Sequence, residues 1–179
     1  MKTKILVFML FFSYSSYSQE EIIIENKINS TFFQFDLSFP LKANTNKNDP
    51  NYKNNSWFLP DGLSAKFGYG LQHKKWIGLS LHSGIDWKGN EKMVVIPVYG
   101  NLRISPGFGN GSRITLQAGF GKGFALGRGN LSGNYQKYSI GFETEDDLIL
   151  FAELSNYDIK IGNFNQVGSF SLGIALRTF

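Results

Sequence analysis

Hydrophobic and polar residues alternate along most of this chain, and the pattern is clearest between Leu63 and Trp87. Apolar residues take every second position from Leu63 to Leu71, and after a turn at His73–Lys75 the alternation resumes from Ile77 to Trp87. Successive side chains of a strand point to opposite faces, so this segment predicts a β-hairpin with one apolar and one polar face. Each arm is about as long as the ~9–11 residues with which a tilted strand crosses a bilayer.

Six further segments alternate in the same way, which predicts eight strands in all. They are Thr31–Phe39, Met93–Ile104, Arg113–Phe120, Asn134–Thr144, Leu148–Asn156 and Val167–Thr178. We expect Pro40 to stop the first of them and Pro97 to cause a bulge, because proline donates no backbone hydrogen bond. The glycine-rich stretch Gly121–Gly133 is predicted to begin as strand and become loop. Sustained helical periodicity is missing from the sequence, so we expect almost no helix.

The connections between these strands differ in length at the two ends of the predicted sheet. With an even number of strands both termini lie at one end, and the three connections there are His73–Lys75, Ser105–Ser112 and Glu145–Asp147, all short. The opposite end carries the longest connection, Leu41–Pro60, whose Asn, Lys and Asp residues favour solvated loop. Lys88–Lys92 is the one short connection at that end. Short periplasmic turns and longer extracellular loops are typical of outer-membrane barrels.

The residues of the polar face distinguish a membrane barrel from a soluble one. A soluble barrel also alternates, but its apolar side faces inward and its outer face carries many Lys and Glu. Here the polar face is mostly Gly, Ser, Gln, Thr and Asn, which suit the inside of a narrow barrel, and the apolar face is almost uncharged through its middle. Phe39, Tyr69, Trp87 and Phe120 lie toward strand ends, where aromatic girdles form.

The sequence therefore predicts an all-β fold, an eight-stranded antiparallel up-and-down transmembrane β-barrel formed by residues 30–179 and located in the cell outer membrane. A soluble periplasmic β-barrel that binds a ligand is the alternative on pattern alone. An N-terminal signal peptide is predicted for residues 1–18: Lys2 and Lys4 precede the apolar run Ile5–Phe12, and Ser16-Tyr17-Ser18 has the spacing that signal peptidase reads. Residues 19–29 are expected to form a periplasmic tail.

Composition excludes several kinds of chemistry. The chain has no cysteine, so it has no disulfide, thiolate zinc site or cysteine nucleophile, and no lipid-anchoring cysteine. Two histidines leave little for a histidine metal site, and we expect no metal and no cofactor. Without Lys2 and Lys4, 16 basic and 14 acidic residues remain, which gives no basic surface for nucleic acid.

The polar face nevertheless carries charges that an eight-stranded barrel would enclose. They are Asp36, Lys66, Asp86, Arg103, Arg113, Lys137, Glu143, Glu153 and Arg177, five basic and four acidic. Buried charges are costly unless they are paired, so the near balance predicts a salt-bridged network that plugs the lumen. Eight strands also give too narrow a barrel for a conducting pore.

Four features carry a resemblance to a known group. They are the signal peptide ending at Ser18-Gln19, the Ile96-Pro97-Val98 strand, the glycine-rich run Gly119–Gly127 and the aromatic last strand. In these the sequence resembles the small outer-membrane β-barrel proteins, the OmpA/OmpX-like and PorT-like group common in Bacteroidota.

We expect a monomer with a structural or surface-interaction role, the latter exercised through Leu41–Pro60. The expected partners are outer-membrane lipids and lipopolysaccharide, and the resemblance implies insertion by the barrel assembly machinery. In this group the machinery reads a last strand that ends in Phe, with apolar residues at odd positions counted back from it. Phe179 is out of phase with Leu172, Ile174 and Leu176, and a bulge near Arg177 would restore the pattern.

Two motifs suggest chemistry. Ser80, His82 and Asp86 share the polar face of one strand, and lipid A deacylases of the outer membrane use His-x-Ser on one strand, whereas the order here is Ser80-x-His82. Residues two apart on a strand lie roughly 6.5–7 Å apart at the backbone, so both rotamers must converge for a hydrogen bond. We expect lumen filling and no catalytic residue, with a lipid-modifying enzyme as the alternative.

The second motif is a pair of glycine-flanked cations, Lys122 and Arg128. A phosphate loop needs a strand–loop–helix context that this sequence lacks. We expect an extracellular loop or a strand bend instead, whose two cations have the charge to meet lipopolysaccharide phosphates at the outer surface.

Overall fold

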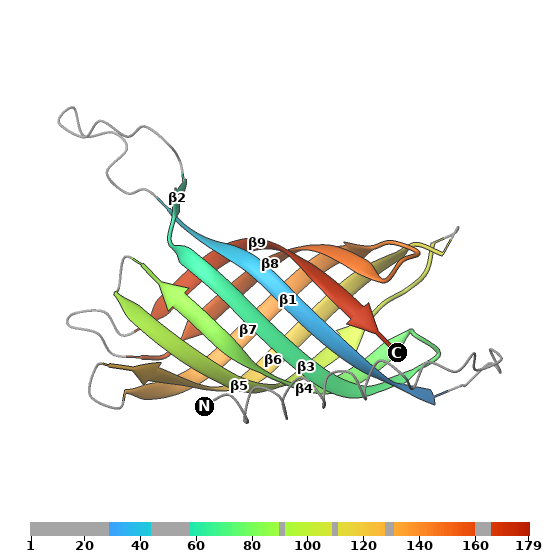
Figure 1. Ribbon diagram of the computed structural model, residues 1–179, viewed down its shortest axis with the longest axis horizontal. Coiled ribbons are helices and arrows are strands. Elements are labelled where there is room, and N and C mark those ends of the chain that lie inside the picture. The colour runs from blue at the N-terminus through green and yellow to red at the C-terminus, as the bar shows by residue number, and fades with distance from the viewer. Residues whose placement is uncertain (1–28, 44–57, 90–91, 109–110, 128–130, 160–165) are drawn as a thin grey trace, which may run out of the picture.

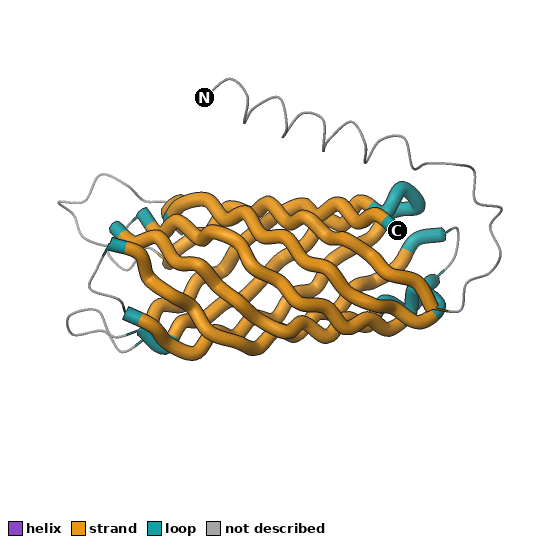
Figure 2. The backbone as a smooth tube through the Cα atoms, turned by 60° about the horizontal axis from the view of Figure 1, so that its bottom comes forward, coloured by secondary structure: helices purple, strands orange, loops and turns teal. Residues whose placement is uncertain are grey.

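A single closed sheet makes up the part of the protein that its computed structural model describes, residues 29–43, 58–89, 92–108, 111–127, 131–159 and 166–179 (Figures 1 and 2). Its strands are β1 (Asn29–Ala43), β2 (Phe58–Pro60), β3 (Gly62–His73), β4 (Ile77–Lys88), β5 (Met93–Ile104), β6 (Arg113–Leu126), β7 (Ser132–Glu143), β8 (Leu148–Tyr157) and β9 (Val167–Thr178). The predicted signal peptide and most of the predicted tail lie outside the described residues. Within those residues there is no helix long and apolar enough to span a membrane.

Eight of these strands form the barrel, because β1 pairs with β3 on one side and with β9 on the other. All pairings are antiparallel; successive barrel strands pair with one another, β1 with β9 closes the sheet, and β2 pairs only with the last residues of β1. When the register is followed once around the barrel from Thr31, it returns to β1 at Leu41, ten residues further on. Such a stagger tilts the strands by about 35–45° to the barrel axis and leaves room inside for side chains only.

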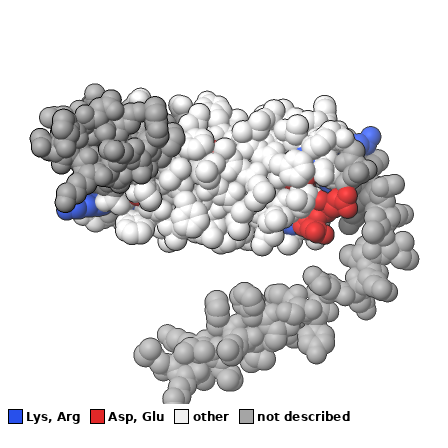
Figure 3. Space-filling model, turned by 90° about the horizontal axis from the view of Figure 1, so that it is seen from above, with Lys and Arg blue, Asp and Glu red and all other residues white. Residues whose placement is uncertain are grey.

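The two faces of the barrel have the reverse of a soluble protein's polarity. On β4, Leu79 and Leu81 face outward and are 66% and 68% exposed, whereas Ser80 and His82 face the lumen and are 5% and 2% exposed. Figure 3 shows the consequence on one face: between the ends of the barrel the visible surface is almost entirely white, and the coloured Lys, Arg, Asp and Glu atoms gather toward the ends. An apolar outer band around a polar interior is the arrangement that hydrocarbon requires. The predicted transmembrane barrel is confirmed.

Single-cysteine labelling tests this assignment of faces, since the chain has no cysteine of its own. We expect a Leu79→Cys variant in membranes to react with a lipid-soluble maleimide and a Ser80→Cys variant to stay unlabelled. Labelling of Ser80→Cys with Leu79→Cys silent would invert the barrel's faces.

The two predictions about proline are wrong. β1 continues through Pro40, which pairs with Ser171 of β9 and accepts a hydrogen bond from the Asp61 amide at 2.8 Å. At Pro97 the ladder to β4 is interrupted, but its register is the same on both sides, and Pro97 pairs with Gly123 across β6 without an offset. In both places proline removes a donor but inserts no extra residue, and pairing along the remaining length keeps the strand in place.

Three other features refine the predicted strands. The glycine-rich stretch begins as strand, as predicted, and β6 runs to Leu126. β8 is apolar on both faces because Ile149 and Phe151 point inward and pack against Ala175 of β9. The suggested bulge near Arg177 is wrong, since β9 pairs with β1 in one register through Thr178.

Candidate functional site

The lumen is the place where this fold gathers its polar side chains. Among the residues that the structure describes, the buried charged side chains (His82 aside) are five basic and five acidic: Lys66, Lys88, Arg103, Lys137, Arg177, Asp36, Asp61, Asp86, Glu143 and Glu153. Equal numbers let each charge be offset inside a low-dielectric space, where an unpaired charge is costly.

The first charge cluster is centred on Glu153 of β8. Lys66 of β3 approaches one of its carboxylate oxygens at 2.6 Å, and Lys137 of β7 approaches the other at 3.0 Å. Each lysine has a second acidic neighbour, Asp86 for Lys66 and Asp36 for Lys137, both at 3.7 Å. Five strands therefore contribute to one ion-pair network across the lumen.

The second cluster is centred on Glu143 of β7, toward the end of the barrel where the termini lie. Arg103 of β5 lies 3.6 Å from one oxygen of Glu143, and Arg177 of β9 donates a hydrogen bond to the other. Arg177 also contacts Asp147 at 3.1 Å, and Arg103 donates to Gln72 at 2.5 Å. One carboxylate again holds two cations, as in the first cluster.

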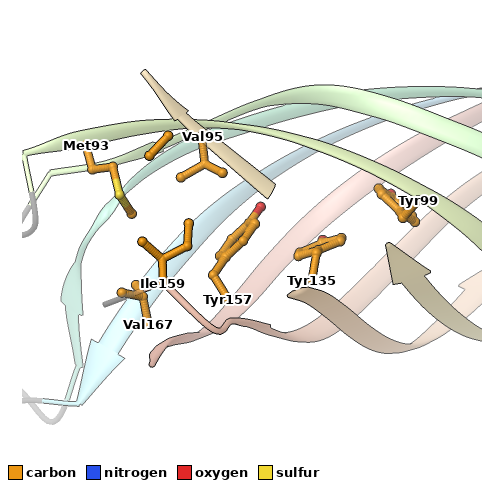
Figure 4. Packing of buried hydrophobic residues seen from close by; sticks show 8 residues of the cluster. Met93, Val95, Tyr99, Tyr135, Tyr157, Ile159 and Val167 are labelled. Atoms are coloured by element: carbon orange, nitrogen blue, oxygen red, sulfur yellow. The ribbon is translucent and has the colours of Figure 1, made fainter. Parts of the chain in front are cut away.

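A stack of four rings runs along the lumen beside the first cluster, and Figure 4 shows its three tyrosines in succession. The ring centroids of Tyr157 and Tyr135 lie 4.6 Å apart and those of Tyr99 and His82 5.2 Å apart, both pairs stacked, whereas Tyr135 and Tyr99 meet edge-on at 4.9 Å. The stack fits because glycines face it: a Cβ added to Gly68 would meet the His82 ring at 2.3 Å. Packing and paired charges together fill the space between the strands.

An apolar cluster packs inside the barrel toward the end away from the termini, and Figure 4 shows its side chains pointing toward one another. It consists of Met93, Val95, Ala125, Ile159 and Val167 together with the three tyrosines of the stack. The side chains are almost fully buried, so apolar packing joins the ion pairs in plugging the barrel.

The Ser80, His82 and Asp86 set is only partly brought together. Ser80 Oγ and His82 Nε2 lie 2.9 Å apart, so the two rotamers do converge. Both oxygens of Asp86 accept hydrogen bonds elsewhere, one from the Ser64 hydroxyl and one from the Tyr157 hydroxyl. Asp86 is thus hydrogen-bonded to Ser64 and Tyr157 and not to the Ser80–His82 pair. All three side chains of the set are buried.

The sequence predicted the wrong surroundings for Lys88 and Arg113 and did not single out Asp147. Lys88, predicted as part of a turn, is 1% exposed and donates to Ser169 at 2.6 Å. Its position is in phase with His82 and Asp86, which is the signal that could have found it. Arg113, predicted in the plug, is half-buried at the rim and donates to backbone carbonyls at 3.3 Å. Asp147 of the β7–β8 turn enters the second cluster although turn residues show no alternation.

The glycine-flanked lysine lies within β6, with Lys122 exposed on the outward face, while Arg128 lies outside the described residues. Among the side chains that the structure does describe, no group of three or more His, Asp and Glu is arranged to hold a metal ion.

No protein-family model matches this sequence, and no curated protein matches it. Solved structures do. Neisserial surface protein A shares 13% identity at a TM-score of 0.52, over 83% of this chain and 97% of that one. The outer membrane protein Ail of Yersinia pestis in a phospholipid bilayer nanodisc shares 12%, with a TM-score of 0.46, over 83% and 100%. Ail in complex with the heparin analogue sucrose octasulfate shares 14%, with a TM-score of 0.34, over 84% and 97%.

At these identities the likeness concerns the fold, and the first of these neighbours has the same closed eight-stranded barrel. The predicted fold class, an eight-stranded antiparallel outer-membrane barrel, is therefore confirmed. With an apolar outer surface on such a barrel, the chain is an integral protein of the outer membrane.

Proposed function

We propose that this barrel is a static outer-membrane scaffold, with a structural or surface-interaction role and neither transport nor catalysis as its task. The observation that carries the proposal is the plugged lumen. Glu153 and Glu143 each hold two cations from other strands, and the aromatic stack occupies the space beside them. A lumen built in this way rigidifies the barrel, because its side chains cannot move without leaving charges unpaired.

The end of the barrel away from the termini supports a surface-interaction role. There β2 continues the pairing of β1 beyond the rim, through Ala43 paired with Phe58 (Figure 1). Asp61 fixes the base of this extension, since its amide donates to Pro40 and its carbonyl accepts from Gly89. The predicted partner-binding segment Leu41–Pro60 starts and ends on this extension, and its residues 44–57 lie outside the described residues.

Planar-bilayer recording tests the plugged lumen. We expect the purified, folded protein to give no sustained channel steps, because paired charges and packed rings occupy the lumen. Heat-modifiable mobility on a gel would verify that the sample is folded. Reproducible steps of fixed conductance would contradict the scaffold.

A second candidate, a lipid-modifying enzyme, is favoured only by the 2.9 Å contact between Ser80 and His82. Both side chains lie inside the barrel, whereas a lipid acyl ester would reach the outer face or the rim. Lipid A from a deletion strain separates the two functions, since an enzyme's loss would change the acylation pattern and a scaffold's loss would leave it unchanged.

We also propose four finer assignments. These are membership of the OmpA/OmpX-like, PorT-like group, a monomeric state, contact with lipopolysaccharide, and insertion by the barrel assembly machinery. The residue that the assembly machinery would read, Phe179, follows the end of β9. The centroid of its ring lies 4.1 Å from the Lys75 ammonium and 4.7 Å from the Arg177 guanidinium.

A further inference from the structure

The outer surface over β7, β8 and β9 has a hollow of about 290 Å³. Its walls include Tyr138, Ile140, Leu154 and Phe170, and its floor is Ala152, which pairs with Ile140. Tyr138, Leu154 and Phe170 are paired in one row across the three strands. A small residue among large ones leaves the hollow, and its lining faces hydrocarbon.

A polar patch lies on the same outer face, next to the hollow and nearer the end that carries the longer connections. Lys122 of β6 pairs with Asn134 of β7, and Gln136 of β7 pairs with Asn156 of β8. Lys122, Asn134 and Gln136 are exposed. Directly paired residues have Cβ atoms about 4.5–5.5 Å apart, and Gln136 and Tyr138 follow each other on the outer face of β7, so patch and hollow form one continuous surface.

Lys122 is exceptional on this surface. Of the outward-facing side chains that the structure describes in the eight barrel strands, only that of Lys122 carries a charge. It lies between Phe120 and Phe124 on β6, and among the described residues its side chain has no hydrogen-bond or ion-pair partner. The nearest carboxylate along the same row of pairs, Asp158, accepts hydrogen bonds from Asn156 at 3.3 Å and Gln166 at 3.1 Å. An exposed ammonium among apolar side chains is stabilised by an anion from outside the protein.

We propose that the hollow and the polar patch together bind one lipid A molecule of the outer leaflet. An acyl chain lies in the hollow over Ala152, and a phosphate of the headgroup meets the Lys122 ammonium, with the Asn134 and Gln136 amides donating to its oxygens. The patch lies toward the end with the longer connections, which is the extracellular end of such a barrel. This inference rests on the proposed outer-membrane orientation and adds to it a defined lipid site.

Native mass spectrometry of the full, folded protein in detergent tests the site with three probes: bisphosphorylated lipid A, the same lipid without phosphates, and phosphatidylglycerol. We expect the bisphosphorylated form to be retained preferentially. A Lys122→Gln variant should bind it about fivefold more weakly, the effect of one lysine at a lipid phosphate. An Ala152→Phe variant should lose retention by filling the hollow.

Two variants control these effects without touching the site: Lys92→Gln at an exposed turn of the same end, and Ala65→Phe on the outer face of β3. Both should bind like the parent protein. Equal binding of the dephosphorylated lipid, equal binding of phosphatidylglycerol, or parent-like binding by Lys122→Gln or Ala152→Phe would each overturn the proposal. Surface labelling of cells measures the membrane orientation separately. A wrong orientation can therefore be distinguished from a correctly oriented barrel that lacks the lipid site.

Discussion

Replacing Glu153 by glutamine is expected to lower the free energy of unfolding by about 3–5 kcal/mol, the cost of removing one partner from a buried ion pair. Glutamine keeps the shape of the side chain but not its charge. Lys66 and Lys137, now 2.6 and 3.0 Å from the carboxylate, would share the low-dielectric lumen with acids no nearer than 3.7 Å. Urea unfolding in lipid vesicles, followed by the heat-modifiable band on a gel, measures the difference.

Glu145→Gln is the matched control, because Glu145 is exposed in the β7–β8 turn, and its effect should stay within about 0.5 kcal/mol. Adding Lys66→Met to Glu153→Gln removes one of the stranded cations. The double variant should therefore lose less stability than the two single variants added together, with a coupling of about 0.5–3 kcal/mol. If Glu153→Gln and Glu145→Gln lowered the free energy of unfolding equally, the ion-pair network in the lumen would not stabilise the barrel.

Gly68→Ala is expected to destabilise the barrel by about 1–3 kcal/mol, although it adds only one methyl group. The new Cβ would lie 2.3 Å from the His82 ring, and that ring is stacked on Tyr99 and hydrogen-bonded to Ser80. The ring cannot yield without disturbing the stack of tyrosines behind it. The same unfolding measurement in vesicles gives the magnitude.

Gly100→Ala provides the comparison, because a Cβ at this outward-facing position meets no atom within 4 Å. Its effect should be near zero or slightly stabilising. A double variant, Gly68→Ala with His82→Ala, should be no less stable than His82→Ala alone, since the colliding ring is gone. If Gly68→Ala proved as stable as Gly100→Ala, the tight fit of the lumen would be disproved.

The alternation of residues was enough to predict the barrel, because a strand with lipid on one side and a packed lumen on the other has a strict period of two. It failed where neighbouring strands outweigh local preference. Pro40 was expected to stop the strand, but at this residue β1 is paired with β9 on one side, and on the other side the Pro40 carbonyl accepts a hydrogen bond from the Asp61 amide. Neither partner can be read from the residues around Pro40.

The contacts inside the lumen could not be predicted from the sequence either. The charged residues of the lumen could be predicted from their phase, but not which of them meet. Lys66 contacts Glu153, a residue 87 positions away, because the stagger of the closed sheet brings β3 and β8 to the same depth. Asp86 was grouped with His82 because both lie on β4, yet its partners are Ser64 and Tyr157 on other strands. Contacts across a barrel depend on closure, and closure is not a local property.

The separation between Lys66 and Glu153 also constrains the order in which the barrel can be assembled. A hairpin of β3 and β4 entering the bilayer alone would carry both Lys66 and Asp86 into hydrocarbon, 3.7 Å apart, before the closer carboxylate of Glu153 on β8 could join them, and charged side chains are costly there. The free edge of β1 would expose unsatisfied backbone groups until β9 arrived. Hairpin-by-hairpin insertion is therefore unfavourable for this chain. We therefore expect the first and last strands to pair before or as the barrel enters the membrane.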